Sequence, residues 1–237
     1  MSTEDQDIII ELKGIHKRYL LKQALTGIDL RIRRGSIVGL LGPNGSGKST
    51  LLKLIAGMIY PTSGSIRVNG REPDVRNKSQ IAYLPEIDNL YGWMTVTETL
   101  NFISGFYADW QADKAAEMLQ TMELEGKQKV RSLSKGMRAR LKLIAALSRK
   151  VPLVLLDEPF SGIDPSSRAK IIRSILSEFQ SDEQTIVLST HSVKESEPMF
   201  DDVVFLQNGW IKKFDSAENL RAAYGCSLEN LWEKVYA

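Results

Sequence analysis

The sequence has a single cysteine, Cys226, among its 237 residues. Without a second thiol the chain cannot form an internal disulfide, which suits a reducing compartment and excludes a small domain held together by disulfides. We interpret Cys226 as a small apolar filler rather than a reactive thiol, because nothing near it in the sequence marks it as reactive.

Long apolar runs are also missing. No segment approaches the roughly 18 consecutive apolar residues that a membrane-spanning helix requires. The first ten residues, MSTEDQDIII, are acidic and lack the basic start and apolar stretch of a signal peptide. We therefore expect a cytoplasmic protein that reaches the inner face of a membrane only through a partner.

An excess of charge of one sign is absent too. The 31 Lys and Arg side chains nearly balance 29 Asp and Glu, for a net charge of +2. No basic run alternates with aromatic residues as a nucleic-acid groove requires, so nucleic acid is not an expected partner. Repeats and low-complexity linkers are missing as well, and 43% hydrophobic residues with 25% charged ones are typical of a globular protein with a large core.

What the sequence does contain is an alternation of short β segments and amphipathic helices. The expected strands are 8–16, 25–35, 36–42, one within 61–70, 81–86, 151–159, 184–191 and a final pair within 203–214. The expected helices are 49–59, 95–110, 113–124, 135–149 and 166–180. The stretch from about 95 to 148 is almost entirely helical, so it reads as an insertion between two halves of an α/β core.

The segment GLLGPNGSGKST, residues 39–50, matches the pattern G-x-x-x-x-G-K-[ST] between an apolar strand and a helix. Its glycines let successive backbone N–H groups converge on an anion, and the helix N-terminus adds positive potential. We expect Lys48 to bridge the β and γ phosphates of ATP and Ser49 to ligate Mg²⁺. The nucleotide-binding residues predicted here are Gly42, Pro43, Asn44, Gly45, Ser46, Gly47, Lys48, Ser49 and Thr50.

Two carboxylates, Asp157 and Glu158, end the apolar run LVLLDEP. Open α/β sheets place their ligand chemistry at the carboxyl ends of strands. We expect Asp157 to organise the Mg²⁺ shell and Glu158 to polarise the attacking water. An acidic pair after a strand is otherwise a common solvated turn.

With these motifs in place, the chain resembles the nucleotide-binding subunits of ATP-binding cassette (ABC) transporters over nearly its whole length. Five motifs follow the order and approximate spacing of that family: the Walker A loop at 42–49, the signature SLSKGMRARL at 132–141, the Walker B strand ending at 158, the D-loop SGID at 161–164 and the switch segment STHS at 189–192. The resemblance implies a P-loop NTPase fold with an ABC-type core at about 1–86 and 150–237, and an inserted helical subdomain at about 87–149.

The resemblance also implies a head-to-tail dimer. Each of two ATP molecules would lie between the Walker A loop of one subunit and the signature of the other. Ser134 offers a hydroxyl and Gly136 a bare N–H at the start of a helix, and both suit a γ-phosphate. Taken alone, the same segment is an ordinary serine-capped helix.

Three further residues take roles from the resemblance. His191 would contact the γ-phosphate and hold the water and Glu158 in line, although a histidine at a strand end is often only structural. Asp164 would couple the two sites of the dimer, cap the helix before Pro165, or do both. Tyr19 would stack on adenine, with core packing as the alternative.

The chain departs from the family pattern at two places. Glu86 stands where the family usually has Gln, and it can still ligate Mg²⁺ while adding a negative charge near the phosphates. The signature carries Lys135 and Met137 where Gly and Gln are usual. We hypothesise that Lys135 of one subunit offsets Glu86 of the other; the alternative is that Lys135 points to solvent.

The segment DNLYGWMTV, residues 88–96, lies where the family receives a helix of the membrane subunit. Its apolar side chains, Leu90, Tyr91, Trp93 and Met94, either anchor that helix or pack the helical subdomain.

We therefore expect an ATPase that uses ATP and Mg²⁺, works as a homodimer or a close heterodimer, and powers an integral-membrane permease. The signature, Glu86 and the tail SLENLWEKVY resemble subunits of ABC-2 type exporters, which favours export of a drug, antibiotic or peptide-like substrate. The alternatives are an importer subunit and a soluble ABC ATPase without a transport role. An inactive scaffold is disfavoured because Lys48, Asp157, Glu158 and His191 are intact.

Overall fold

The computed structural model describes residues 7–74, 78–179 and 184–236. Its strands are β1 (Ile8–Tyr19), β2 (Lys22–Arg33), β3 (Ile37–Leu41), β4 (Ser63–Val68), β5 (Ile81–Leu84), β6 (Leu153–Asp157), β7 (Thr185–Thr190), β8 (Asp202–Gln207) and β9 (Trp210–Ser216). Its α-helices are α2 (Lys48–Ile55), α4 (Val96–Ser104), α5 (Ala112–Thr121), α6 (Lys135–Leu147), α7 (Pro165–Glu178), α8 (Ala217–Tyr224) and α9 (Leu228–Tyr236). Two 3₁₀ turns, η1 (Val130–Ser132) and η2 (Glu197–Met199), complete the described elements.

The main sheet has six strands in the order β5-β6-β7-β3-β8-β9. All neighbouring pairs are parallel except β8 and β9, so the sheet is mixed, as the sequence predicted. Every residue of β3, β6 and β7 is buried, which explains why these strands read as continuous apolar runs rather than alternating ones. In a sheet whose strands are mostly parallel, the carboxyl ends of these strands lie side by side, and functional side chains gather there.

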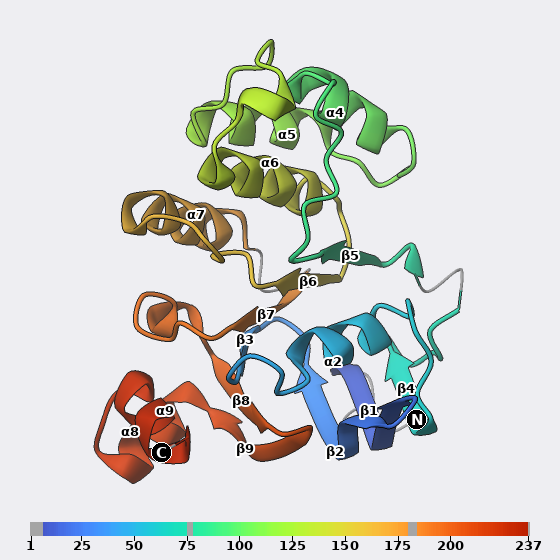
Figure 1. Cartoon of the computed structure of the whole chain (residues 1–237), viewed down its shortest axis with the longest axis vertical. Helices are drawn as coiled ribbons and strands as arrows, with labels where there is room; N and C mark the ends of the chain where they lie inside the picture. The colour runs from blue at the N-terminus through green and yellow to red at the C-terminus, as the bar shows by residue number, and fades with distance from the viewer. Residues whose placement is uncertain (1–6, 75–77, 180–183, 237) are drawn as a thin grey trace.

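A second, antiparallel sheet of three strands, in the order β2-β1-β4, lies beside the first. Its apolar face packs on α2 and on one face of the main sheet, forming a core that includes Leu12, Ile28, Leu52 and Leu155. The helices α6, α7, α8 and α9 cover the other face (Figure 1). The helix that follows the glycine-rich loop is therefore held between two sheets.

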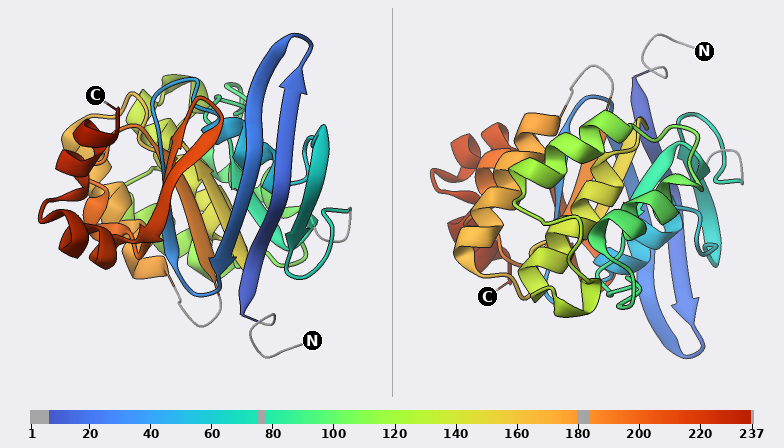
Figure 2. Two further views of the ribbon diagram at one scale, coloured as in Figure 1. Left: turned by 90° about the horizontal axis from the view of Figure 1, so that it is seen from below. Right: turned by 90° about the horizontal axis from the view of Figure 1, so that it is seen from above.

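The helices α4, α5 and α6 lie together at one end of the molecule, between β5 and β6 in the chain (Figures 1 and 2). A capping box starts α4, in which Thr95 and Glu98 exchange side-chain and backbone hydrogen bonds. The prediction of a helix over 95–110 was too long. The helix ends at Ser104, Gly105 follows it, and Trp110 instead bridges to Arg149 beside the end of α6.

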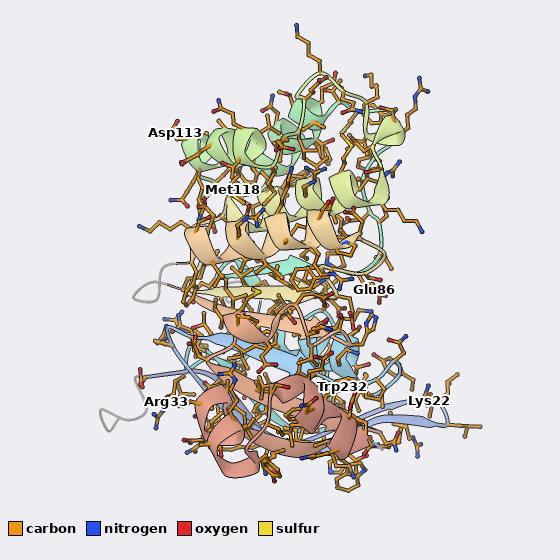
Figure 3. All side chains as sticks on the ribbon, turned by 90° about the vertical axis from the view of Figure 1, so that its left-hand side faces the viewer. Lys22, Arg33, Glu86, Asp113, Met118 and Trp232 are labelled. Atoms are coloured by element: carbon orange, nitrogen blue, oxygen red, sulfur yellow. The ribbon has the colours of Figure 1, made fainter. Side chains whose placement is uncertain are left out.

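Met118 of α5 is buried in the core that the helical end shares with the main sheet, whereas Asp113 of the same helix is exposed (Figure 3). Among the described residues, no helix combines the length and apolar character needed to cross a bilayer.

Candidate nucleotide site

The glycine-rich loop between β3 and α2 is shaped by contacts that exclude larger residues. A Cβ at Gly42 would lie 2.4 Å from the carbonyl oxygen of Leu206. Gly47 has φ of 112°, and a Cβ there would lie 2.8 Å from the carbonyl oxygen of Ala24. Both glycines are therefore required for the loop to fit against β8 and β2.

Lys48 is the first residue of α2, and its ammonium group turns back over the loop. Its Nζ donates to the carbonyl oxygens of Gly42 at 2.7 Å and Pro43 at 3.3 Å. It also lies 3.1 Å from Oε1 of Glu158, with only 6% of either side chain exposed. A positive charge is thus held at the centre of the loop by two carbonyls and one carboxylate.

Asp157, the last residue of β6, accepts three hydrogen bonds. Ser49 donates to Oδ1 at 3.0 Å and Ser189 of β7 donates to the same oxygen at 2.8 Å. Tyr83 of β5 donates to Oδ2 at 3.2 Å, and burial, followed by the nearby charge of Asp157, raises the pKa of the tyrosine hydroxyl. The carboxylate is therefore fixed in orientation by three neighbouring elements.

Glu158 follows Asp157 in an unusual backbone conformation, with φ of 47°. Left-handed residues other than glycine are uncommon and often occur at functional sites. Here the backbone N–H of Glu158 donates to Ser189 Oγ at 2.9 Å, which stabilises the turn. Its Oε2 lies 2.8 Å from Nδ1 of His191, whose side chain is 46% exposed. The turn thus aims one carboxylate at both Lys48 and His191.

An open cleft lies over the loop, and residues from four separate segments line it. It is lined by Tyr19, Lys22, Ala24, Asn44, Gly45, Gly47, Lys48, Ser49, Thr50, Glu86 and Glu158. Figure 3 shows Lys22, near the tip of the β1–β2 hairpin, on the same side of the molecule as Glu86. The ring of Tyr19 is at the end of β1 and 44% exposed, so it is not part of the core. Of the predicted loop residues, Gly42, Pro43 and Ser46 do not line the cleft, and Gly42 and Ser46 are buried.

The oxygen atoms near Ser49 match the requirements of Mg²⁺, which prefers hard oxygen ligands such as hydroxyl and carboxylate. Ser49 and Asp157 are already in contact, and Ser49 and Glu86 line the same cleft. Among the described residues no group of three His, Cys, Asp or Glu side chains could hold a metal. The predicted Mg²⁺ site does not need such a group of three. Its protein ligands are a serine hydroxyl and two carboxylates, and phosphate oxygens and water would complete the coordination.

Three of the predicted site residues lie elsewhere. Ser134 caps α6 by accepting from Met137 N at 3.2 Å, and Asp164 caps α7 by accepting from Ser167 N at 3.0 Å. The hydrogen bonds from Ser167 and Ser166 hold the pKa of the Asp164 carboxyl well below its ordinary value. Gly136 packs beside Ser167, so the starts of α6 and α7 are neighbours. None of Ser134, Gly136 and Asp164 lines the cleft as the structure describes it.

The sequence reasoning missed two residues of the site, Ser189 and Tyr83. Ser189 is completely buried and connects the backbone of Glu158 to the side chain of Asp157. A polar residue inside the apolar run TIVLST, two positions before the histidine, was the available signal. Tyr83 lies three residues before Glu86 in a short strand, and nothing local indicates that its hydroxyl reaches β6.

Comparison with known proteins agrees with this geometry. The model of the ABC transporter family matches residues 25–161. The daunorubicin resistance ATP-binding protein DrrA3 of Streptomyces coeruleorubidus is 33% identical over 92% of this chain and 72% of its own length. The probable sulfate/thiosulfate import ATP-binding protein CysA of Chlorella vulgaris is 36% identical over 89% of this chain and 92% of its own length.

A solved structure gives the same result. The cassette MJ0796, determined as a dimer in a post-hydrolysis state with ADP and Pi, superimposes with a TM-score of 0.78. It is 25% identical, and the match covers 87% of this chain and 98% of that one. With the phosphate loop, the paired carboxylates and the mixed sheet in place, the chain belongs to the ABC transporter family as an ATP-binding subunit with the P-loop NTPase fold, and it is an ATPase.

Proposed function

We propose that this subunit hydrolyses ATP to power export of a drug, antibiotic or peptide-like substrate through a separate membrane permease. The observation that carries the hydrolytic part is the position of Glu158, whose carboxylate contacts Lys48 on one side and His191 on the other. The relative named for daunorubicin resistance supports export. The relative named for import keeps an importer subunit as the second candidate.

Binding of the nucleotide follows from the cleft. Tyr19 would stack on adenine, and the N–H groups of residues 42–50 would surround the phosphates. Lys48 would exchange its carbonyl and carboxylate partners for phosphate oxygens. Mg²⁺, held by Ser49, Asp157 and Glu86, would neutralise the developing charge on the phosphates.

Hydrolysis would use Glu158 as the group that orients and polarises water. Once Lys48 contacts phosphate, Oε1 of Glu158 is released from its ion pair and can accept a proton from water. His191 would hold Glu158 through its Nδ1 contact while its other ring nitrogen points to the γ-phosphate. Ser189 keeps Glu158 in its left-handed turn during the reaction.

The site requires a second subunit. Ser134, Gly136 and Asp164 do not line the cleft, although Ser134 and Asp164 are exposed and sit at helix starts. The N–H groups of a helix's first turn have no partner within the helix, so the start of α6 can bind an anion. We propose that it binds the γ-phosphate held by a second copy or a close homologue, with Asp164 at the interface between the two.

The permease would dock on an aromatic surface beside α4. Tyr91, Trp93, Phe102 and Phe106 form a chain of ring contacts with centroids 5.1 to 5.9 Å apart, and all four rings are at least 43% exposed. Met94 is 7% exposed and belongs to the core, so core packing holds for that side chain, and we assign the docking role to the exposed aromatic side chains. An amphipathic helix of the permease suits such a surface, since aromatic anchors dominate many interfaces.

Two assignments follow from this docking. The segment 87–149 would act as a helical subdomain that contacts the permease, while about 1–86 and 150–237 bind nucleotide. The subunit would lie on the cytoplasmic face of the membrane through the permease alone.

Copurification with the permease tests this proposal. When the tagged protein is expressed in the organism that encodes it, a polytopic membrane protein should copurify with it. Trp93→Ala should reduce the amount of membrane protein that copurifies. Trp210→Ala is the matched control, because Trp210 is also exposed, at 51%, but lies on β9. An exporter-type permease without a substrate-binding protein supports export. A permease that copurifies with such a binding protein favours the importer, and no membrane protein at all favours a soluble ATPase.

A further inference from the structure

One lysine of α6 binds three consecutive carbonyl groups of the loop that follows β5. Lys142 Nζ donates to Pro85 O at 2.5 Å, Glu86 O at 3.1 Å and Ile87 O at 2.9 Å. An ammonium group has three donors, so this one lysine uses all of them on the loop. Lys142 is partly buried, and this burial lowers the pKa of its ammonium group.

A second residue of the same helix binds the next residue of the loop. Arg138 Nη1 lies 2.6 Å from Oδ2 of Asp88. Arg138 and Lys142 are four residues apart, so they lie on one side of α6. Ser134 is four residues before Arg138, at the start of that side. Residues 85–88 are therefore attached to α6 at four successive positions.

This attached loop carries Glu86 into the nucleotide cleft. Glu86 lines the cleft together with Ser49, and its own carbonyl is one of the three that Lys142 binds. Hydrogen bonds from Lys142 to these carbonyl oxygens could serve the stability of the fold alone. The two roles can be distinguished, because a purely structural lysine would not affect the part that the Glu86 carboxylate plays in the cleft.

We propose that Lys142 and Arg138 are positioning residues that set the place of Glu86 in the cleft. Because α6 is one continuous helix, a displacement at Ser134 moves both side chains and shifts Glu86. Contact of one subunit's signature with nucleotide would in this way alter the Mg²⁺ site of the same subunit. The inference rests on the proposed function for the role of Glu86.

The test measures nucleotide binding rather than turnover. In Glu158→Gln protein, the fluorescence of MANT-ATP is followed while MgCl₂ is added. Lys142→Met should raise the Mg²⁺ concentration for half-maximal binding about five-fold. Such a factor lies within the range expected from coupling energies between contacting groups. Lys142→Arg should restore part of the loss, and Lys127→Met, at an exposed lysine before η1, should change nothing.

A double-mutant cycle separates positioning from general stability. In Glu86→Ala protein there is no carboxylate to position, so Lys142→Met should produce little further change. An equal shift in both backgrounds overturns the proposal, as does no shift with Glu86 present. If Lys142→Met does not fold, Asp88→Asn and Arg138→Gln probe the other attachment, and each should shift the Mg²⁺ midpoint only when Glu86 is present. Failure of every variant to bind MANT-ATP would contradict the proposed function instead.

Discussion

The residues that we propose to contact the phosphates lie in two places that are built differently. At the ends of β3 and β6, the charged groups are buried and contact one another, as Lys48 does with Glu158. At the starts of α6 and α7, Ser134 and Asp164 are exposed, and each side chain caps its own helix. The charged groups of the first region are paired within one chain, whereas the residues of the second are exposed helix caps.

Under the proposed function, this difference explains how one chain can be folded and still need a second chain for catalysis. Buried charges need partners in the same chain, because an unpaired buried charge would cost several kcal/mol. Helix caps at a surface need no such partners and remain stable in a single chain. The comparison predicts that substitutions in the first region affect both stability and chemistry, while those in the second affect chemistry much more than stability.

The largest effect is expected at Glu158. Glu158→Gln keeps the size of the side chain but removes the proton acceptor, so kcat should fall about 10²- to 10⁴-fold, the range for loss of a general base. ATP binding should persist, because the phosphate contacts belong to the loop. Phosphate release and MANT-ATP affinity measure the two properties separately. Loss of binding together with turnover would mean that Glu158 acts mainly by holding Lys48.

Ser189→Ala should show the cost of a buried hydrogen-bond donor that has lost its acceptor. The substitution leaves the Glu158 N–H without its acceptor and removes one donor from Asp157, which should lower the free energy of unfolding by about 1–3 kcal/mol. Turnover should fall as well, because the left-handed turn at Glu158 loses its support. Urea unfolding of wild type and Ser189→Ala checks the first effect, and Ser177→Ala on α7 serves as a serine control. Unchanged stability would contradict the network.

Ser134 allows capping to be separated from phosphate binding. Ser134→Ala should lower the free energy of unfolding by about 1 kcal/mol, whereas Ser134→Gly should lower it by only a few tenths. Both substitutions remove the hydroxyl, so both should reduce turnover to a similar extent. Thermal unfolding and ATPase rates of the pair test this. If Ser134→Gly keeps full activity, the residue is only a cap.

The smallest effect on stability is expected at Asp164. Asparagine caps helices about as well as aspartate, so Asp164→Asn should leave the Tm near pH 7 almost unchanged. The lowered pKa of Asp164 means that its contribution is present above the ordinary pKa and is lost only as the pH falls through the lower folded value. Thermal scans should therefore separate in acid, where the wild type loses this contribution and Asp164→Asn, which does not titrate, keeps its cap. A reduced ATP-dependent dimer at neutral pH would support the interface role.

Much of the buried region could be predicted from sequence because its signals are local. The glycine spacing, the apolar strand before it and the amphipathic helix after it are read within twenty residues. The two carboxylates are found because they end an apolar run. Register is not local, however: Asp157 meets Ser189 because β6 and β7 pair in parallel with these residues opposite each other. No periodicity within either strand specifies that pairing.

The helical end was predicted less well for the same reason. The predicted helix over 95–110 was too long because the apolar spacing of the sequence continues past Gly105. In the structure the helix ends at Ser104, and Trp110 pairs with Arg149 in a β-bridge. The attachment of Lys142 to Glu86 spans 56 residues and joins a helix to a loop. Such contacts depend on how elements pack, which single-residue patterns do not encode.

The most direct test of the shared site is the association state of Glu158→Gln protein. Sedimentation velocity with Mg·ATP should show a dimer, and the same protein with Mg·ADP should be monomeric. Adding Ser134→Glu, which places a negative charge where the γ-phosphate of the other subunit would lie, should abolish the dimer while MANT-ATP binding by the monomer persists. A protein that binds MANT-ATP but stays monomeric with ATP at every concentration, or that dimerises equally with ADP, would contradict a site completed by two chains.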